Sequence, residues 1–345
     1  MKKIVLITVF LLTLAFMFTA CTRAASVGVI GGADGPTNIV VQTPADKIDD
    51  ITIVLDWTPN INHTGLYVAE HMGFFLEEGI NVEIKQPGDN YALQLVAAGQ
   101  AEFGVSYQEE VVFARAAEVP VISIAGVIQH NTSCFAAPKE NGIKTVADFA
   151  GKTYGGWGGY VEEALLGYLM EQEGQPANSV KIINIGSSDF FAATAADVDF
   201  SWIFYGVTGV EAELRGVELD TIYLRDIDPA FDYYTPVLVA EEAWLKGNED
   251  LTRRFLAAAS KGYEYADAYP DLAAEMLSTA APELDAEMVK AGQEWLAGQY
   301  QGDAEFWGWQ NPDVWQDFAA WMIERGLLDA GFEPESAFTN DYLQK

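Results

Sequence analysis

Residues 51–84 read ITIVLDWTPNINHTGLYVAEHMGFFLEEGINVEI. The short apolar run from Ile51 to Leu55 predicts a buried strand. A helical pattern follows over residues 64–76, is closed by Glu77-Glu78-Gly79, and gives way to a second strand over Val82–Ile84. A strand, a helix and a strand in this order predict a βαβ unit, and therefore a parallel sheet.

The alternation continues toward the C-terminus. In the first region we expect a helix at 91–98, a strand at 103–105, a helix at 109–117 and a strand at 121–125. A second region starts after Pro138, with a helical turn at 146–149, strands at 152–154, 182–185 and 199–204, and a helix at 161–172. A strand at 235–240 is expected to return to the first region, ahead of long helices that include 249–268 and 312–325. This order predicts an α/β fold with two lobes, each a mostly parallel sheet flanked by helices.

The chain begins with the features of an export signal. Lys2 and Lys3 precede an apolar run over Ile4–Phe18, and small residues then lead into Cys21. Such a start is typical of a secretory signal peptide. The cysteine that follows resembles a bacterial lipoprotein box, which implies a lipid on Cys21; the alternative is an ordinary signal peptide with a chance cysteine. We expect a signal peptide over 1–20, a flexible tether over 21–49, and an extracytoplasmic chain anchored to the cell membrane by the lipid.

The composition excludes several classes of partner. Lys and Arg total 19 against 51 Asp and Glu, a formal net charge of −32, which repels nucleic acid and anionic lipid. The two cysteines, Cys21 and Cys134, leave no disulfide framework if Cys21 carries lipid, and Cys134 is expected to be a buried apolar residue. With three histidines in addition, the chain shows no zinc-ligand spacing, so we expect no metal.

Polar and aromatic residues follow four of the predicted strands. In open α/β sheets, ligands bind beyond the carboxyl ends of the strands. The four clusters are Asp56–His63, which includes Trp57 and Asn62, then Ser106–Glu109, Gly155–Gly159 around Trp157, and Phe204–Gly206 with Glu211 on the next helix. The aromatic residues offer flat faces for a ring, and the glycines allow close approach of a backbone and place N–H groups at a helix start.

Each cluster also has a plainer interpretation. A single Trp or Tyr is more often part of a core, and the glycine turn lacks the Lys-Ser/Thr ending of a phosphate loop. We expect His63 to be structural, while His130 faces the cleft or caps a strand end, and Glu211 could lie on a solvated helix face. The recurrence of the same chemistry at four strand ends favours a binding site.

Enzyme motifs are not evident. The chain has no G-x-S-x-G elbow, no metal cluster and no paired carboxylates at a suggestive spacing. The strand-end clusters offer ring stacking and hydrogen bonds without an activated nucleophile. We therefore expect a binding protein with no cofactor, rather than an enzyme.

Long strings of this sequence carry a resemblance to a known family. The chain from Ile51 to about Leu343 resembles the NMT1/THI5-like solute-binding proteins of ABC importers, above all those for thiamine pyrimidine precursors, the hydroxymethyl- and formylaminomethyl-aminopyrimidines. Riboflavin-binding relatives share much of the pattern. The strings are LDWTPNINHTGLYVAE (55–70), FGVSYQEEVVFARA (103–116), IQHNTS (128–133), GKTYGGWG (151–158), WIFYGVTGVEAELRG (202–216) and YYTPVL (233–238).

The resemblance implies a type II periplasmic-binding-protein fold with a ligand cleft between two lobes that close on it. The crossovers would lie near 135–138 and 233–238, so lobe I would consist of 50–137 plus 238–345, and lobe II of 138–237. The protein would be a monomer that serves an ABC permease and its ATPase.

The family also implies a ligand site. Carried over by position, Trp57 and Tyr205 would flank the ring, Asn62 and Glu211 would bond its polar edge, and Ser106, Gln108 and Trp157 would line the pocket, together with Glu109 and Tyr234. The alternatives are riboflavin or another flat heterocycle, while sulfonate or nitrate is disfavoured because Glu211 is an acceptor. A pyrimidine-synthase-like enzyme is less favoured, since the cysteine-rich motif of the fungal enzymes is absent.

Overall fold

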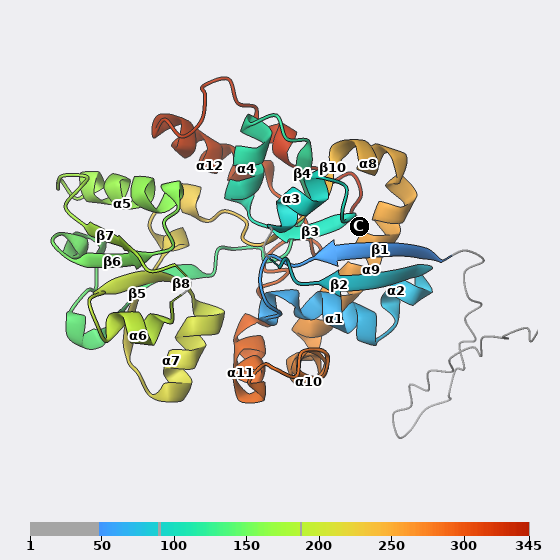
Figure 1. The fold of residues 1–345 in the computed structure, drawn as a ribbon, viewed down its shortest axis with the longest axis horizontal. Helices are drawn as coiled ribbons and strands as arrows, with labels where there is room; N and C mark the ends of the chain where they lie inside the picture. Colours follow the sequence, from blue (N-terminus) through green and yellow to red (C-terminus); the bar gives the residue numbers. More distant parts are fainter. Residues whose placement is uncertain (1–47, 89–90, 187, 345) are drawn as a thin grey trace, which may run out of the picture. The chain divides into compact units, whose positions relative to one another are not determined.

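The computed structural model describes residues 48–88, 91–186 and 188–344, and its strands form two separate five-stranded sheets (Figure 1). The predicted signal peptide, Cys21 and nearly all of the predicted tether lie outside the described residues. Residues 48–344 belong to one compact unit. Within the described residues, no helix has the length and apolar character needed to cross a membrane.

The first sheet, which we call the lobe I sheet, has the strand order β2-β1-β3-β10-β4. Its strands are β1 (Asp49–Val54), β2 (Ile80–Lys85), β3 (Phe103–Ser106), β4 (Val121–Gly126) and β10 (Val237–Glu241). β1 pairs in parallel with β2 and β3, whereas β10 is antiparallel to both of its neighbours. Four of the five strands therefore run the same way.

The second sheet, the lobe II sheet, repeats this plan with the order β7-β6-β8-β5-β9. Its strands are β5 (Ser133–Pro138), β6 (Thr153–Gly156), β7 (Lys181–Asn184), β8 (Phe200–Phe204) and β9 (Leu219–Tyr223). Here β5 is the antiparallel strand. In each sheet the reversed strand, β5 or β10, is the one that begins just after the chain crosses from the other sheet.

The division of the chain at 138 and 237 stays a prediction, but the pairing of β5 refines it. All of Ser133–Pro138 lies in the lobe II sheet, so the chain leaves the lobe I sheet between Gly126 and Ser133, ahead of the expected crossover at 135–138. The return strand expected at 235–240 is found as β10 in the lobe I sheet.

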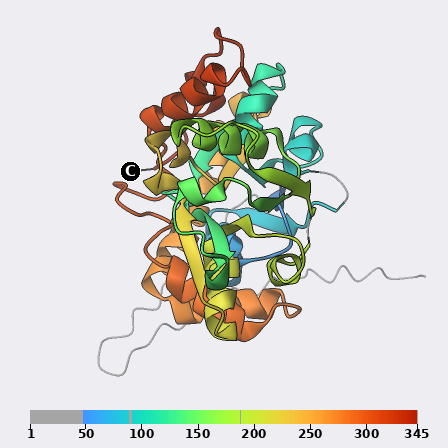
Figure 2. The same cartoon turned by 90° about the vertical axis from the view of Figure 1, so that its left-hand side faces the viewer.

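Helices cover both faces of each sheet (Figures 1 and 2). Around the lobe II sheet, α5 lies on one face and α6 and α7 on the other. The lobe II helices are α5 (Tyr160–Gln172), α6 (Phe190–Thr194) and α7 (Val210–Arg215). The helices of the first region and the C-terminal region are α1 (Thr64–His71), α2 (Phe74–Glu77), α3 (Ala92–Ala97), α4 (Gln108–Ala116), α8 (Glu242–Gly247), α9 (Glu249–Ala268), α10 (Pro270–Ala280), α11 (Ala286–Leu296) and α12 (Pro312–Glu324).

Three differences from the predicted elements have physical reasons. The helix expected over 64–76 is split, because Gly73 takes a φ of 78° between α1 and α2. The six residues of β5 are all buried, so the strand shows no alternation that the sequence could reveal. All five residues of the edge strand β9 are half-buried, which hides the same signal. As expected, Cys134 is free and buried, and burial raises the pKa of its thiol to about 12.

Helices α1 and α9 cross in close contact beneath the lobe I sheet. A Cβ atom at Gly262 would overlap the carbonyl oxygen of Gly65, and one at Gly65 would overlap the ring of Tyr263. Tyr263 stacks on Trp307 with ring centroids 4.4 Å apart, and its hydroxyl donates to the carbonyl of Asn62 at 3.0 Å. The helix crossing therefore supports the loop that follows β1.

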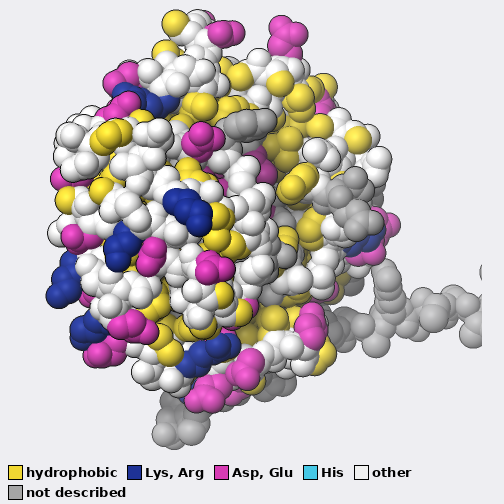
Figure 3. All heavy atoms as spheres, turned by 60° about the vertical axis from the view of Figure 1, so that its left-hand side comes forward, with side chains coloured by type: hydrophobic (Ala, Val, Ile, Leu, Met, Phe, Trp, Pro, Cys, Tyr) yellow, Lys and Arg dark blue, Asp and Glu magenta, His cyan; other side chains and the backbone are white. Residues whose placement is uncertain are grey.

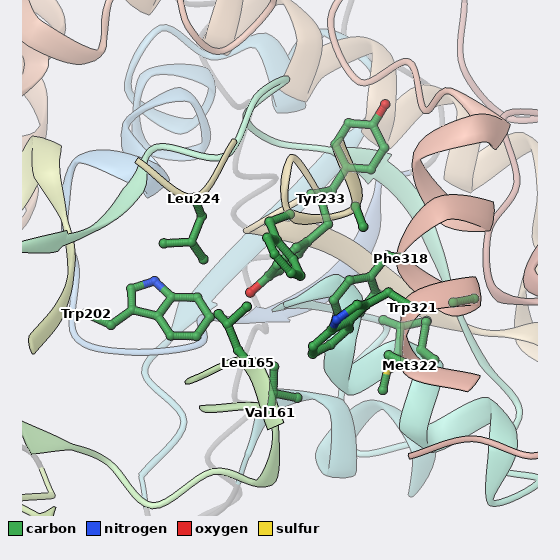
Figure 4. Close-up of a cluster of buried hydrophobic side chains, with 14 of the residues drawn as sticks. Val161, Leu165, Trp202, Leu224, Tyr233, Phe318, Trp321 and Met322 are labelled. Carbon is green, nitrogen blue, oxygen red and sulfur yellow. The ribbon is translucent and has the colours of Figure 1, made fainter. Parts of the chain in front are cut away.

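Helix α12 packs against both lobes. Its residues Phe318, Trp321 and Met322 join a buried cluster with Tyr233 of the second crossover and with side chains of α5 and β8 (Figure 4). Arg325, just beyond the helix, pairs with Glu171 of α5 at 2.7 Å. The C-terminal region therefore contributes to the core of lobe II as well as to that of lobe I.

Candidate functional site

The carboxyl ends of strands from both sheets come together at the crossovers. Tyr205, directly after β8, donates its N–H to the carbonyl of Thr132 in the first crossover at 3.3 Å. Gln108, two residues after the end of β3, donates its N–H to the carbonyl of Tyr234 in the second crossover at 3.1 Å. Two of the four predicted strand-end clusters, those at Ser106–Glu109 and Phe204–Gly206, are thus tied to the segments where the chain passes between the sheets.

Asp56 organises the loop after β1. His63 is fully buried, and its Nε2 lies 2.6 Å from Asp56 Oδ1, while its Nδ1 accepts the N–H of Asn60 at 3.2 Å. This pattern requires the tautomer with the proton on Nε2. Tyr107 donates its hydroxyl to Asp56 Oδ2 at 2.5 Å. Burial pushes the pKa of Asp56 upward, but the interactions with His63 and Tyr107 outweigh it and leave that pKa below its usual value.

Two tryptophans offer open ring faces at these strand ends. Trp57 follows Asp56 in the anchored loop and is 56% exposed, and Trp157 follows β6 and is 47% exposed. Trp157 packs on Trp202 of β8 with ring centroids 5.1 Å apart. The packing on Trp202 positions the Trp157 ring, and both tryptophans keep an exposed aromatic surface of the kind that can stack on a flat molecule.

The glycine-rich turn before α5 is filled by the protein itself. The buried carboxylate of Glu162 accepts the N–H groups of Gly158 at 2.8 Å and Gly159 at 2.7 Å, and the hydroxyl of Tyr154 at 2.6 Å. The expectation that these N–H groups are available to a ligand is therefore wrong. The spacing from Gly159 to Glu162, which matches the carboxylate position of a helix capping box, is the sequence signal that points to this arrangement.

Tyr205 lies in an aromatic cluster with rings from β9 and α11. It begins a π-helical turn, η4 (Tyr205–Gly209), and its ring lies 5.7 Å from Tyr223 of β9 and 5.2 Å from Trp295 of α11, centroid to centroid. Its hydroxyl donates to Glu213 at 2.6 Å, and burial together with this bond raises the pKa of Tyr205 to about 12. Two rings thus already pack on the tyrosine that was expected to flank a ligand.

Close backbone contact accompanies this cluster. A Cβ atom on Gly292 of α11 would lie 2.8 Å from the carbonyl oxygen of Gly206, and one on Gly206 would lie 3.0 Å from the Trp295 ring. Ile61 borders both glycines. The two glycines therefore allow α11 to touch η4, which follows β8 of the lobe II sheet, a contact that the sequence did not reveal because the two glycines are far apart in the chain.

Several of the expected ligand residues use their polar groups inside the protein. Gln108 accepts the N–H of Tyr234 at 2.8 Å and donates to the carbonyl of Val314 at 3.3 Å. The Tyr234 hydroxyl accepts the N–H of Asn311 at 2.8 Å, and Ser106 donates to Glu110 at 2.7 Å. These bonds hold β3 and α4 to the second crossover and to α12.

The two acidic residues among the expected ligand residues, Glu211 and Glu109, differ in their surroundings. Glu211 forms an ion pair with Arg215, one turn further along α7. Glu109, in the first turn of α4, has a buried Oε2 for which residues 48–88, 91–186 and 188–344 provide no hydrogen-bond partner. Burial, with a further contribution from Glu110, raises the pKa of Glu109 to about 8. Asn62 is half-buried in η1 (Ile61–His63), next to the glycine contact described above.

His130 links both crossovers to the C-terminal region. Its Nδ1 lies 2.6 Å from Asp232 in the second crossover, and its Nε2 lies 3.0 Å from Asp303 in the loop after α11. The pKa of His130 is raised to about 8, first by its hydrogen bond to Asp232 and then by the charge of Asp232 and the bond and charge of Asp303. On the face of the molecule that includes lobe II, Figure 3 shows acidic and basic side chains interspersed.

This geometry predicts a pH-dependent stability. Because the folded pKa of His130 lies above its ordinary value of 6.5, the stabilisation is fully present below pH 6.5 and is lost as the pH rises through 8. We expect the melting temperature of the native protein to exceed that of a His130→Gln variant at pH 6, with the difference shrinking by pH 9. Thermal unfolding across this range measures it, and a difference that does not change with pH would contradict the interpretation. Asp232 and Asp303 are the charged groups that face the ring.

Known proteins similar to this chain include binding proteins and synthases. The sequence matches the family described as NMT1/THI5 like over residues 60–273. A formylaminopyrimidine-binding protein of Halalkalibacterium halodurans is 27% identical, and the match covers 86% of this chain and 91% of that protein. A 4-amino-5-hydroxymethyl-2-methylpyrimidine phosphate synthase of Legionella pneumophila is 28% identical, with 68% and 74% covered. The riboflavin-binding protein RibY of Chloroflexus aurantiacus is 24% identical, with 99% of both chains covered.

Solved structures confirm the predicted fold. The periplasmic aliphatic sulphonate binding protein SsuA of Escherichia coli superimposes with a TM-score of 0.67 at 16% identity, covering 84% of this chain and 97% of that one. The two mixed sheets and their flanking helices thus form a periplasmic-binding-protein fold. Among the residues that the structure describes, no group of three or more His, Cys, Asp or Glu side chains is arranged to hold a metal.

Proposed function

The chain belongs to the NMT1/THI5-like family, and we propose that it is an extracytoplasmic solute-binding protein that captures an aminopyrimidine precursor of thiamine and delivers it to an ABC importer. A lipid on Cys21 would hold it at the cell membrane. The observation that carries the proposal is the pair of open tryptophan faces, Trp57 and Trp157, at strand ends of the two sheets, together with a buried Glu109 oxygen that has no hydrogen-bond partner among the described residues.

The chemistry of an aminopyrimidine suits this surface. Its ring is flat and can stack on an indole, an interaction worth about 0.5–1.5 kcal/mol beyond the area buried. Its edge carries an amine donor beside a ring nitrogen, which a carboxyl or amide group can bond at two points. The relative named as a formylaminopyrimidine-binding protein, which matches over most of both chains, supports this class of ligand.

Binding rather than catalysis is supported by the state of the candidate acid–base groups. His63 uses both ring nitrogens on Asp56 and Asn60, and Asp56 is also bonded to Tyr107. Groups committed to such bonds hold a loop in place and are not positioned to move a proton on a ligand. The proposal therefore differs from the activity named for the synthase relatives.

Riboflavin is the second candidate, favoured by the relative RibY, whose match spans nearly the whole of both chains. Its ring system is also flat and would stack on the same tryptophans. A yellow purified protein, or quenching of flavin fluorescence on mixing, would favour this candidate over the aminopyrimidine.

A thermal-shift panel tests the proposal. Hydroxymethyl-aminopyrimidine at about 100 times its Kd should stabilise the protein by about 2.7 kcal/mol, and nitrate or an alkanesulfonate should not. Replacing Trp157 with alanine should weaken binding at least about tenfold, because it removes a stacking face. The matched control is Tyr269→Ala, which removes an aromatic ring that is 54% exposed at the start of α10. Equal affinity in the Trp157 and Tyr269 variants would contradict the assigned stacking face.

A further inference from the structure

We infer that Glu109 is the group that recognises the polar edge of the ligand, and that it does so as a neutral carboxylic acid. The inference rests on the proposed function and assigns to Glu109 the role that the family resemblance implied for Glu211. It would place the recognition of the ligand's edge on lobe I, at the start of α4.

The position of Glu109 is fixed by its neighbour. Gln108 ties the first turn of α4 to the second crossover through Tyr234 and to α12 through Val314. Gln108 is fully buried, so this anchor is shielded from water. Glu109 therefore projects from a rigid backbone at the carboxyl edge of the lobe I sheet, which is where ligands bind in this class of sheet.

The carboxyl of Glu109 is incompletely bonded. Its Oε2 is buried and has no hydrogen-bond partner in the part of the chain that the structure describes. Buried polar atoms of this kind are uncommon in native proteins, and each requires an explanation. Glu110 is the neighbouring charge that acts on it, and since that group is also acidic, it disfavours the ionised form of Glu109.

The surroundings of Glu109 connect it to the Trp157 side of the site. Burial and the nearby carboxyl of Glu109 raise the pKa of Tyr233 well above its usual value. Tyr233 is in turn one of the groups that raise the pKa of Tyr154, whose hydroxyl donates to Glu162 in the turn beside Trp157. Figure 4 shows the Tyr233 ring between Trp202 of β8 and the α12 residues Phe318 and Trp321.

Trp202 supplies a second unsatisfied polar atom at this place. Its indole Nε1 is buried without a hydrogen-bond partner among the described residues, and its ring packs on Trp157. Glu109 of α4 and Trp202 of β8 thus each carry a buried polar atom without a partner among the described residues, and Trp202 packs on Trp157, whose ring is partly exposed. Glu211, by contrast, already has Arg215 as its partner.

A neutral acid is complementary to the edge of an aminopyrimidine. Its carbonyl oxygen accepts from the ligand's amine, and its O–H donates to the adjacent ring nitrogen. A glutamine side chain presents the same pattern, because its carbonyl accepts and its NH₂ donates. An ionised carboxylate lacks the donor, and its charge faces the lone pair of the ring nitrogen.

Calorimetric titration of hydroxymethyl-aminopyrimidine into the full chain and its variants tests the inference. We expect Glu109→Gln to bind within about threefold of the native protein, Glu109→Leu to bind at least about thirtyfold more weakly, and Glu211→Gln to bind within about threefold. The native affinity should fall as the pH rises through about 8, and that of Glu109→Gln should not. Melting temperatures of each variant establish that it is folded.

The outcomes separate the two proposals. If the native protein fails to bind, the proposed function is overturned. If the native protein and Glu109→Leu bind equally well, this inference alone is overturned and the function stands. If Glu109→Gln loses as much affinity as Glu109→Leu, the neutral form is excluded, and if Glu211→Gln loses it instead, the role returns to Glu211.

Discussion

Replacing Gly262 with alanine is expected to lower the free energy of unfolding by about 3 kcal/mol, an effect at the upper end for overpacking. The added methyl group would overlap the carbonyl oxygen of Gly65, which is backbone and has little freedom to move. Helices α1 and α9 would have to separate, and Tyr263 would lose its position under the loop after β1. The melting temperature should fall by about 5 °C.

The control for this prediction is Gly247→Ala at the end of α8, where an added Cβ atom meets no heavy atom within 4 Å. We expect that variant to change stability by less than about 0.5 kcal/mol. Chemical and thermal unfolding of both proteins provide the comparison. If Gly262→Ala were as stable as the control, the close helix crossing would not exist as described.

Replacing Gly292 with leucine is expected to weaken ligand binding by about thirtyfold while leaving the unliganded protein folded. Gly292 of α11 touches the carbonyl of Gly206 in η4, so a side chain there would hold the lobes apart. A cost of about 2 kcal/mol for bringing them together lowers the population of the binding-competent form, and the apparent affinity falls by the same factor. Lobe closure on the ligand is itself a proposal, and it is the step this variant tests.

Two measurements decide this second prediction. Titration gives the affinity, and small-angle scattering with and without ligand shows whether the variant still becomes more compact. The matched control is Gly247→Leu, which places the same side chain in open space. Native affinity in Gly292→Leu would mean that contact between α11 and η4 is not needed for binding.

Much of the fold follows from local patterns in the sequence. Helix α9 was predicted at 249–268 and has these bounds, because it is long and strongly amphipathic. The strands β1, β3 and β8 lie within one or two residues of their predicted positions. Strands β5 and β9 were missed, because uniform burial in the one and uniform half-burial in the other leave no alternation to read.

The sequence could predict which strand ends carry candidate ligand residues, but not which of those residues are free to bind a ligand. The rule that ligands bind at the carboxyl ends of strands selects Trp57 and Trp157, and both are exposed. It does not reveal which polar groups form hydrogen bonds within the protein. Those of Gln108, Tyr234 and the glycine turn do. Those bonds join residues far apart in the chain or depend on rotamers, and the ligand roles of the remaining residues stay predictions.

The position of Trp295 illustrates the same limit. It lies 90 residues beyond Tyr205, on a helix that was not predicted, yet the two rings pack 5.2 Å apart. The contact depends on glycines at 206 and 292, whose importance appears once the helices are placed.

The most direct test of the proposed function is calorimetric titration of hydroxymethyl-aminopyrimidine into the purified chain at pH 7. The account predicts one saturable, heat-releasing binding event per chain. It also predicts that Trp157→Ala binds the ligand at least about tenfold more weakly than the native protein. No heat and no change in melting temperature at millimolar ligand would contradict it.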